Sequence, residues 1–103
     1  MKKIIDKVLY NTETAEQIAF YSSNYNPGDF EYFEERLYQT KKGNWFLHGE
    51  GGPSSPYTET FGNSRSGSQE IVPMDEDEVI EWLERRQLID VLETHFGHAI
   101  EEA

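Results

Sequence analysis

The acidic side chains of the C-terminal third are the residues whose type and spacing most clearly suggest a chemical role. From residue 70 to residue 103 the chain carries eleven acidic residues against two arginines. A row of carboxylates on one helix face can imitate the phosphates of a nucleic acid and bind a basic groove. The alternative is a solvated helix face that maintains solubility. The candidate partner-binding residues are Asp75, Glu76, Asp77, Glu78, Glu81 and Glu84.

Histidines are the next candidates for chemistry. His95 and His98 have a spacing that fits one metal ion only if a helix continues through Gly97, which is a stop signal. Zinc needs three or four ligands, and the chain has no cysteine. We therefore predict no metal ion and no cofactor.

His48 and Glu50 lie beside a segment rich in glycine and serine, where a histidine and a glutamate can do acid–base chemistry. Nucleophilic catalysis needs a third group held in place, and no serine of this segment occurs in a nucleophile-elbow pattern. The glycines lack the continuation of a phosphate-binding loop. We predict no catalytic residues. A small hydrolase or nuclease acting at His48 and Glu50 is the enzymatic alternative.

Composition indicates one small domain spanning residues 1–103. The apolar share is 36% and the aromatic share 14%, which favours a single core built from a few large side chains. We expect these to include Trp45, Trp82, Phe33 and Phe46. Within the domain we distinguish a β-rich part (1–50), a loop rich in glycine, serine and proline (51–70), and a part with a short strand and two helices (71–97).

Charge and hydropathy limit the classes of partner and the cellular compartment that we expect for this protein. The net charge of −11 opposes binding to a phosphate backbone, so no direct contact with nucleic acid is expected. No apolar run approaches the roughly 20 residues of a membrane span, and the N-terminus lacks the apolar core of a signal peptide. The absence of cysteine fits a reducing cytoplasm. Three of the nine basic residues lie within the first seven positions, which predicts a dipolar molecule.

The N-terminal half reads as short strands and turns. Residues 4–5 and 8–10 are β-favouring and are separated by Asp6 and Lys7, which suit a two-residue turn. A further strand is expected over 17–22.

The clearest hairpin pairs residues 34–40 with 44–48 across a turn with positive φ at Gly43. In its second arm, Trp45 and Leu47 share one face, while Phe46 and His48 share the other.

Residues 51–70 are predicted to be a long loop, and such loops in compact domains are usually functional or mobile. Tyr57 and Phe61 are expected to pin its middle to the body. A short strand over 69–72 should end at Pro73, which cannot donate to a β-ladder.

Asp75 is predicted to cap a helix, with Glu78 in capping-box spacing. At 100° per residue, the apolar faces before and after Gln87 point about 200° apart, so one straight helix cannot bury both. We predict two helices, over 75–86 and 88–96. The fold class is therefore α+β, a small antiparallel sheet of about four or five strands followed by two C-terminal helices packed on one face.

Aromatic side chains offer a second kind of contact surface. Trp82 is expected in the core, with a partly exposed interface anchor as the alternative. Tyr25, Tyr32 and Tyr57 can form a contact patch, because interfaces favour aromatic residues.

Several blocks of the sequence resemble a family of short proteins from conjugative elements and phages of low-GC Gram-positive bacteria. The central block, LYQTKKGNWFLHGEGG, is the most specific. Some members of that family are identified as anti-CRISPR proteins directed at type II-A Cas9 systems. The resemblance implies a mobile-element origin and, further, inhibition of Cas9, but it carries over no functional residue. The blocks are residues 2–5, 10–16, 37–52, 62–64 and 81–84.

Charge and resemblance together predict a non-enzymatic inhibitor in the cytoplasm of a bacterial host. It would bind a basic, nucleic-acid-handling protein, with Cas9 or its guide-loaded complex as the first candidate, because Cas9 holds guide and target in basic channels. The mechanism would be occlusion by the acidic C-terminal helices, helped by the loop at 51–68. The alternative is an accessory interaction protein of a mobile element that has no CRISPR target and forms a homo-oligomer through exposed aromatic residues.

Overall fold

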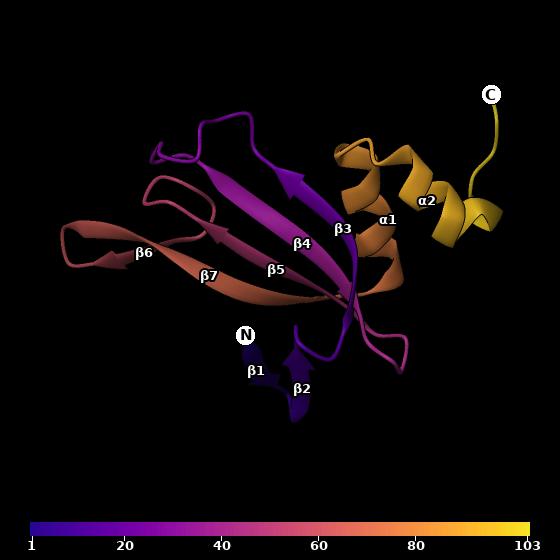
Figure 1. The fold of residues 1–103 in the computed structure, drawn as a ribbon, viewed down its shortest axis with the longest axis horizontal. Coiled ribbons are helices and arrows are strands. Elements are labelled where there is room, and N and C mark those ends of the chain that lie inside the picture. Colours follow the sequence, from indigo (N-terminus) through magenta and orange to yellow (C-terminus); the bar gives the residue numbers. More distant parts are fainter.

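The computed structural model describes residues 1–103 and confirms the α+β class: a five-stranded antiparallel sheet, a separate two-stranded hairpin and two C-terminal helices (Figure 1). The strands are β1 (Lys2–Ile5), β2 (Val8–Asn11), β3 (Glu16–Ser22), β4 (Phe33–Gln39), β5 (Trp45–Gly51), β6 (Thr58–Phe61) and β7 (Ser64–Met74). The helices are α1 (Glu76–Arg85), α2 (Ile89–Phe96) and a 3₁₀ turn (Gly97–Ala99).

The larger sheet has the strand order β3-β4-β5-β7-β6, with every neighbouring pair antiparallel, while β1 and β2 pair only with each other. The predicted hairpin between β4 and β5 is confirmed, and Gly43 in its turn has φ 91°. The predicted turn at Asp6 and Lys7 is also confirmed, with φ values of 50° and 68°. Positive φ at both central residues is the geometry that joins two twisted strands through two residues.

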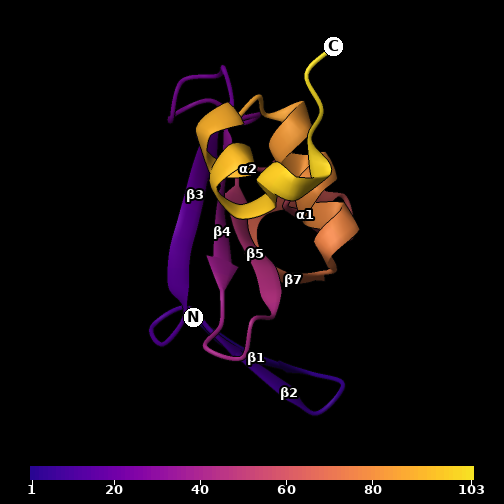
Figure 2. The same ribbon diagram turned by 90° about the vertical axis from the view of Figure 1, so that its right-hand side faces the viewer.

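Both helices cover one face of the larger sheet (Figure 2). Side chains at alternate positions of β4 and β5 point to that face and meet the apolar stripes of the helices. Trp82 is 1% exposed, which confirms its predicted place in the core. Phe33 is only half-buried, at the margin of this layer. The buried cluster consists of Ala19, Leu37, Trp45, Leu47, Val79, Trp82, Leu83 and Phe96.

The predicted break between the helices is confirmed at Gln87. Its φ of 53° lies in the left-handed region, and its side chain donates to the carbonyl of Glu84 at 2.7 Å. The second helix ends at Phe96 as expected, although Gly97 keeps a φ of −55° and leads into a 3₁₀ turn rather than a left-handed cap. Neither helix has the length and apolar content that crossing a membrane requires.

The opposite face of the sheet is only partly covered. There β1 and β2 lie over a second buried cluster of Tyr38, Phe46 and Ile71. The ring of Tyr10 meets Phe46 edge-on at 5.5 Å, and Tyr38 stacks on Phe46 at 5.1 Å. Beyond this hairpin the same face carries polar side chains.

The predicted loop over 51–70 is wrong, because most of this segment forms a β-hairpin. The four residues of β6 pair with residues 64–67 of β7, and Gly62 in the turn has φ 60°. All four side chains of β6 are exposed, so no apolar periodicity marks the strand. The predicted anchoring holds for Tyr57, which is buried, but not for Phe61, which is 66% exposed.

The predicted end of the last strand at Pro73 is also wrong. The strand β7 continues to Met74, and Pro73 stands opposite Phe46 of β5. One edge of β7 pairs with β5 along residues 68–74. The opposite edge pairs with β6 only at residues 64–67, so it is unpaired near Pro73. Proline is tolerated on such an edge, where no ladder hydrogen bond is lost.

Two glycines of β5 let the chain fold back over the helix-side face of the sheet. A Cβ atom on Gly49 would overlap the ring of Tyr57, and one on Gly51 would overlap the side chain of Ser55. The hydroxyl of Ser55 donates to the carbonyl of Gly52 at 2.7 Å and accepts from the backbone N–H of Tyr57 at 3.1 Å. The Tyr57 ring thus occupies space that a β5 side chain would otherwise fill.

We predict that Gly49→Ala lowers the free energy of unfolding by about 3 kcal/mol, because the added methyl group must displace a buried aromatic ring. Chemical denaturation measures the change. The control is Gly28→Ala, since a Cβ atom there meets nothing within 4 Å and should alter stability by about 0.5 kcal/mol at most. Equal effects of the two variants would contradict this role of Gly49.

Candidate functional site

The first turn of α1 is built by the capping box predicted from the sequence. A side-chain oxygen of Asp75 accepts from the backbone N–H of Glu78 at 2.8 Å, and a side-chain oxygen of Glu78 accepts from that of Asp75 at 3.0 Å. Two of the six candidate carboxylates are therefore bound to the helix backbone. They help to begin the helix, and they are less free to bind a partner.

The other four candidates, Glu76, Asp77, Glu81 and Glu84, are exposed. Spacings of three and four residues place the last three on one stripe, and this stripe lies opposite the buried side of α1. The three ion pairs of the protein include none of the four. The helix thus carries these four exposed carboxylates, and none of them forms an ion pair with a basic side chain of the protein. We call these four residues the α1 acidic face.

The β6–β7 hairpin, which stands where a contact loop was expected, lies far from this face (Figure 1). It projects from one end of β7, whereas α1 begins after the other end. The eleven residues of β7 span about 35 Å at 3.3 Å per residue. One compact interface on α1 would therefore not include the hairpin.

A buried carboxylate fixes α1 against the sheet. Glu35 of β4 is 7% exposed, and its Oε1 accepts from the indole Nε1 of Trp82 at 3.0 Å. The same oxygen accepts from the guanidinium of Arg86 at 2.7 Å, and Oε2 accepts from the hydroxyl of Tyr57. Charge-assisted hydrogen bonds of this kind are about twice as strong as neutral ones. The acidic face is therefore carried on a helix with a defined position.

Arg86 and Tyr57 complete this buried network. The guanidinium of Arg86 lies over the ring of Tyr21, 4.0 Å from its centre, and its Nε is buried without a hydrogen-bond partner. Burial, together with the hydrogen bond to Glu35, raises the pKa of Tyr57 far above its ordinary value. The phenol therefore stays neutral and remains a donor to the carboxylate.

Sequence reasoning missed this network. Glu35 was given no role, and Arg86 was counted only as one of the two arginines in the acidic C-terminal third. One signal was present, because Glu35 stands between Phe33 and Leu37 at a position where the strand alternation expects an apolar side chain. The donors that make an acid tolerable there lie 22, 47 and 51 residues away in sequence.

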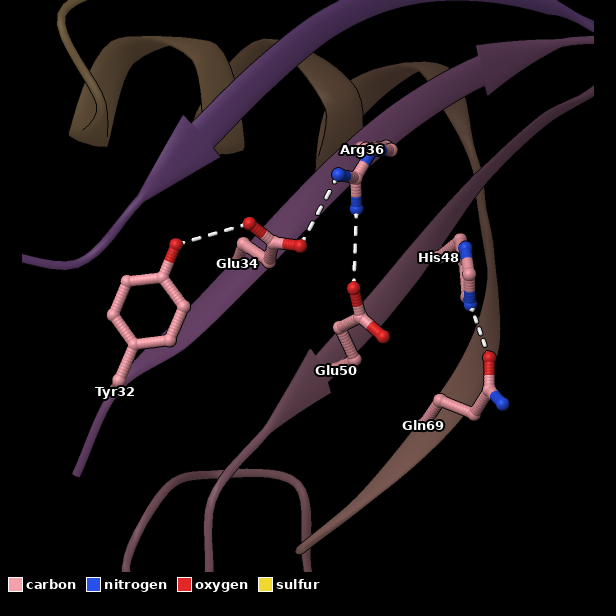
Figure 3. Close-up of polar contacts among 6 residues, drawn as sticks. All are labelled: Tyr32, Glu34, Arg36, His48, Glu50 and Gln69. Atoms are coloured by element: carbon pink, nitrogen blue, oxygen red, sulfur yellow. Dashed lines mark hydrogen bonds and ion pairs between the residues drawn. The ribbon is translucent and has the colours of Figure 1, made fainter. Parts of the chain in front are cut away.

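The uncovered part of the opposite sheet face carries a second polar cluster (Figure 3). The hydroxyl of Tyr32 donates to Glu34 at 3.0 Å, and Arg36 pairs with Glu34 at 3.1 Å and with Glu50 at 3.5 Å. Glu34 and Glu50 stand directly opposite each other in the β4–β5 register. Like charges in this arrangement repel, and Arg36 offsets part of that repulsion.

The two carboxyl groups differ in their affinity for protons. Hydrogen bonding to Glu50, Tyr32 and Arg36 lowers the pKa of Glu34 below its ordinary value. Hydrogen bonding to Glu34, with partial burial and the Glu34 charge, raises the pKa of Glu50. As pH falls, Glu50 therefore takes up a proton before Glu34 does.

The candidate acid–base pair is on this face too, but its members have separate partners. The Nε2 atom of His48 is hydrogen-bonded to Gln69 Oε1 at 2.8 Å, while Glu50 pairs with Arg36 (Figure 3). No hydrogen bond joins His48 to Glu50 or to a serine. Two neighbouring carboxyl groups are brought together, but without the oriented nucleophile and base of covalent hydrolysis.

The other candidate side chains are dispersed. His95 lies edge-on to Trp45, with ring centres 5.8 Å apart. No group of three or more histidine, aspartate or glutamate side chains is arranged to hold a metal ion. Of the three tyrosines considered for a contact patch, Tyr25 is exposed, Tyr32 is half-buried and Tyr57 is buried. They do not form one surface.

We predict that Glu35→Gln lowers the free energy of unfolding by about 2–3 kcal/mol, because Arg86 loses its only anionic partner in a largely buried site. Urea denaturation of Glu35→Gln, Arg86→Met and the double variant measures the coupling between the two residues. The double variant should be less destabilised than the sum of the single variants. Additive effects would show that the pair does not interact.

We predict opposite effects for the two opposed carboxyl groups at pH 7. The pKa of Glu50 is raised in the folded protein, so its contribution to stability is present at low pH and is lost as pH rises. At pH 7 Glu50→Gln should therefore maintain or increase stability. The pKa of Glu34 is lowered in the folded protein, so its contribution to stability is present when the pH is above the ordinary pKa of 4.5. Glu34→Gln should therefore decrease stability at pH 7. Unfolding free energies at pH 3 and pH 7 test both signs, and both differences should shrink at pH 3. A larger loss at pH 7 for Glu50→Gln than for Glu34→Gln would refute the assignment.

Comparison of the chain with protein-family models, with curated proteins and with solved structures finds no match. The resemblance to the mobile-element family therefore stays a prediction from the sequence blocks.

Proposed function

We propose that this protein is a non-enzymatic inhibitor of a bacterial defence nuclease and that it acts in the cytoplasm of the host cell. It binds a basic, nucleic-acid-handling surface through the α1 acidic face. The supporting observation is that four exposed carboxylates share one short helix and form no ion pair within the protein. Cas9, free or guide-loaded, is the first candidate partner because of the resemblance to anti-CRISPR proteins.

The presentation of these carboxylates favours binding. Asp77, Glu81 and Glu84 succeed one another about every helical turn, roughly 5.4 Å along the axis. Because α1 is held by buried side chains and by the Glu35 network, little backbone entropy is lost when the row meets a partner. A preorganised row of carboxylates can therefore bind the basic side chains of a groove that normally holds phosphates.

The chemistry of the partner follows from this match. A channel that holds nucleic acid is lined by Lys and Arg, and a protein with a net charge of −11 is attracted to it at long range. Occupation of the channel excludes guide or target strands, because both need the same cations. Association should weaken as salt is raised, since exposed charges are screened within about 8–10 Å at physiological ionic strength.

The test is plasmid interference in cells that carry an active type II-A CRISPR system. We expect the wild-type protein to restore plasmid uptake, and a variant with Glu76, Asp77, Glu81 and Glu84 changed to Lys to lose this effect. Asp75 and Glu78 stay unchanged, because the capping box needs them. Purified variants are checked for folding by circular dichroism.

The matched control reverses four other exposed acids, Glu13, Glu16, Glu31 and Glu59, and therefore makes the same change in net charge. The control should keep the inhibitory effect. Full inhibition by the α1 variant would refute binding through this face, and equal loss in both variants would leave only a general effect of charge. If the wild-type protein is expressed and plasmid uptake is unchanged, Cas9 is not the target. The accessory-protein alternative is then pursued by pull-down at low salt.

A further inference from the structure

We propose that the hollow between the β1–β2 hairpin and the β4–β5 turn is a binding site for the phosphate of a small phosphate ester such as a nucleotide. The hollow has a volume of about 380 Å³. It is lined by residues 7–11 and Thr14 on one side and by residues around the turn at 40–44 on the other. None of these residues belongs to α1, so the inference is independent of the proposed function.

The charge of the lining points to an anion. Lys7, Lys41 and Lys42 all contribute, and no acidic residue lines the hollow. None of the three lysines takes part in an ion pair, although the chain has 20 acidic residues. One third of the nine basic residues of the protein therefore face one small volume without internal counter-charges. Up to three ammonium groups suit a phosphate, which carries more charge than a carboxylate.

Neutral polar groups extend the donor set. The side-chain oxygen of Asn11 accepts from the backbone N–H of Glu13 at 2.9 Å, so its amide N–H groups are left as donors. Asn44 lines the facing side, where its backbone N–H donates to the hydroxyl of Thr40 at 3.1 Å. These contacts hold both walls in place around the lysines.

An apolar wall in the same hollow indicates that the phosphate is attached to an organic group. Val8, Leu9 and Tyr10 line it, and Leu9 is 54% exposed. The Tyr10 ring is fixed against Phe46, so it offers a preformed surface for a flat base. Small-molecule sites range from about 300 to 1,000 Å³, and this hollow lies at the lower end. A mononucleotide fits that combination of charge, apolar surface and size.

The acidity of the whole protein limits how far the phosphate-bearing ligand can extend. A long nucleic acid would leave the hollow and pass over surface that carries the net charge of −11. Beyond about 8 Å the field of the lysines is screened, so only groups inside the hollow gain from it. The same phosphate chemistry has two sources, a free nucleotide and the phosphorylated end of a short oligonucleotide.

Calorimetric titration of the full chain at low salt tests the site with AMP, pyrophosphate and adenosine as probes. We expect saturable binding of AMP and pyrophosphate, and binding of adenosine weaker than that of AMP by about tenfold or more, because adenosine lacks the phosphate. The double variant Lys41→Gln/Lys42→Gln should weaken AMP binding by about tenfold or more. If a 5′-phosphorylated dinucleotide binds more tightly than AMP, the phosphate that the site recognises is that of an oligonucleotide end. If AMP binds more tightly, the ligand is a free nucleotide.

The matched control is Lys2→Gln/Lys3→Gln, which removes the same charge from β1 outside the hollow and should change AMP affinity by no more than about twofold. A second site variant, Lys7→Asn, removes a lysine while retaining a side chain that tolerates the positive φ at this position. Its AMP affinity should also fall. Absence of saturable phosphate binding, equal binding of adenosine and AMP, or equal losses in the control and the site variants would overturn the proposal.

Discussion

The buried carboxylate of Glu35 is the interaction on which the rest of the structure depends. An ionised group in a site this enclosed is tolerated only when its oxygens are fully hydrogen-bonded and its charge is balanced. Its donors are Tyr57 in the segment before β6, Trp82 in α1 and Arg86 at the C-cap of α1. One residue of β4 thus ties the sheet to two other parts of the chain. Removal of Tyr57 would leave Oε2 without its donor, and removal of Arg86 would leave the carboxylate without its cation. The position of α1, and of the carboxylates on its outer side, follows from this requirement.

Alternation along β4 gives neighbouring glutamates opposite roles. Side chains of consecutive strand residues point to opposite faces, so Glu35 enters the helix-side layer while Glu34 faces the uncovered side. Glu35 meets a cation and two neutral donors, whereas Glu34 meets a second carboxyl group across the ladder and shares Arg36 with it. One carboxylate stabilises the fold, and the other creates a titrating pair on the surface.

The same alternation explains the glycines of β5. Gly49 and Gly51 face the helix side, where the ring of Tyr57 and the side chain of Ser55 take the space of absent side chains. His48 and Glu50 face the other way and remain available to solvent and to neighbouring strands. Residues 48–51, which the sequence suggested as a candidate acid–base site beside a flexible segment, are thus part of the regular strand β5. Its small residues make room for the buried network, and its polar residues belong to the opposite face.

Features with short-range causes were determined by the sequence alone. The capping box at Asp75 and the turn at Lys7 depend on residues a few positions apart, and the helix break at Gln87 follows from the apolar periodicity on its two sides, so pattern and propensity suffice to predict them. Tertiary structure alone decided the β6–β7 hairpin, the continuation of β7 through Pro73 and the burial of Glu35. A hairpin exposed on both faces has no apolar periodicity, and the tolerance for a proline depends on which edge of the strand is unpaired. A buried acid depends on donors brought from distant parts of the chain, and only the packed fold determines where those donors lie.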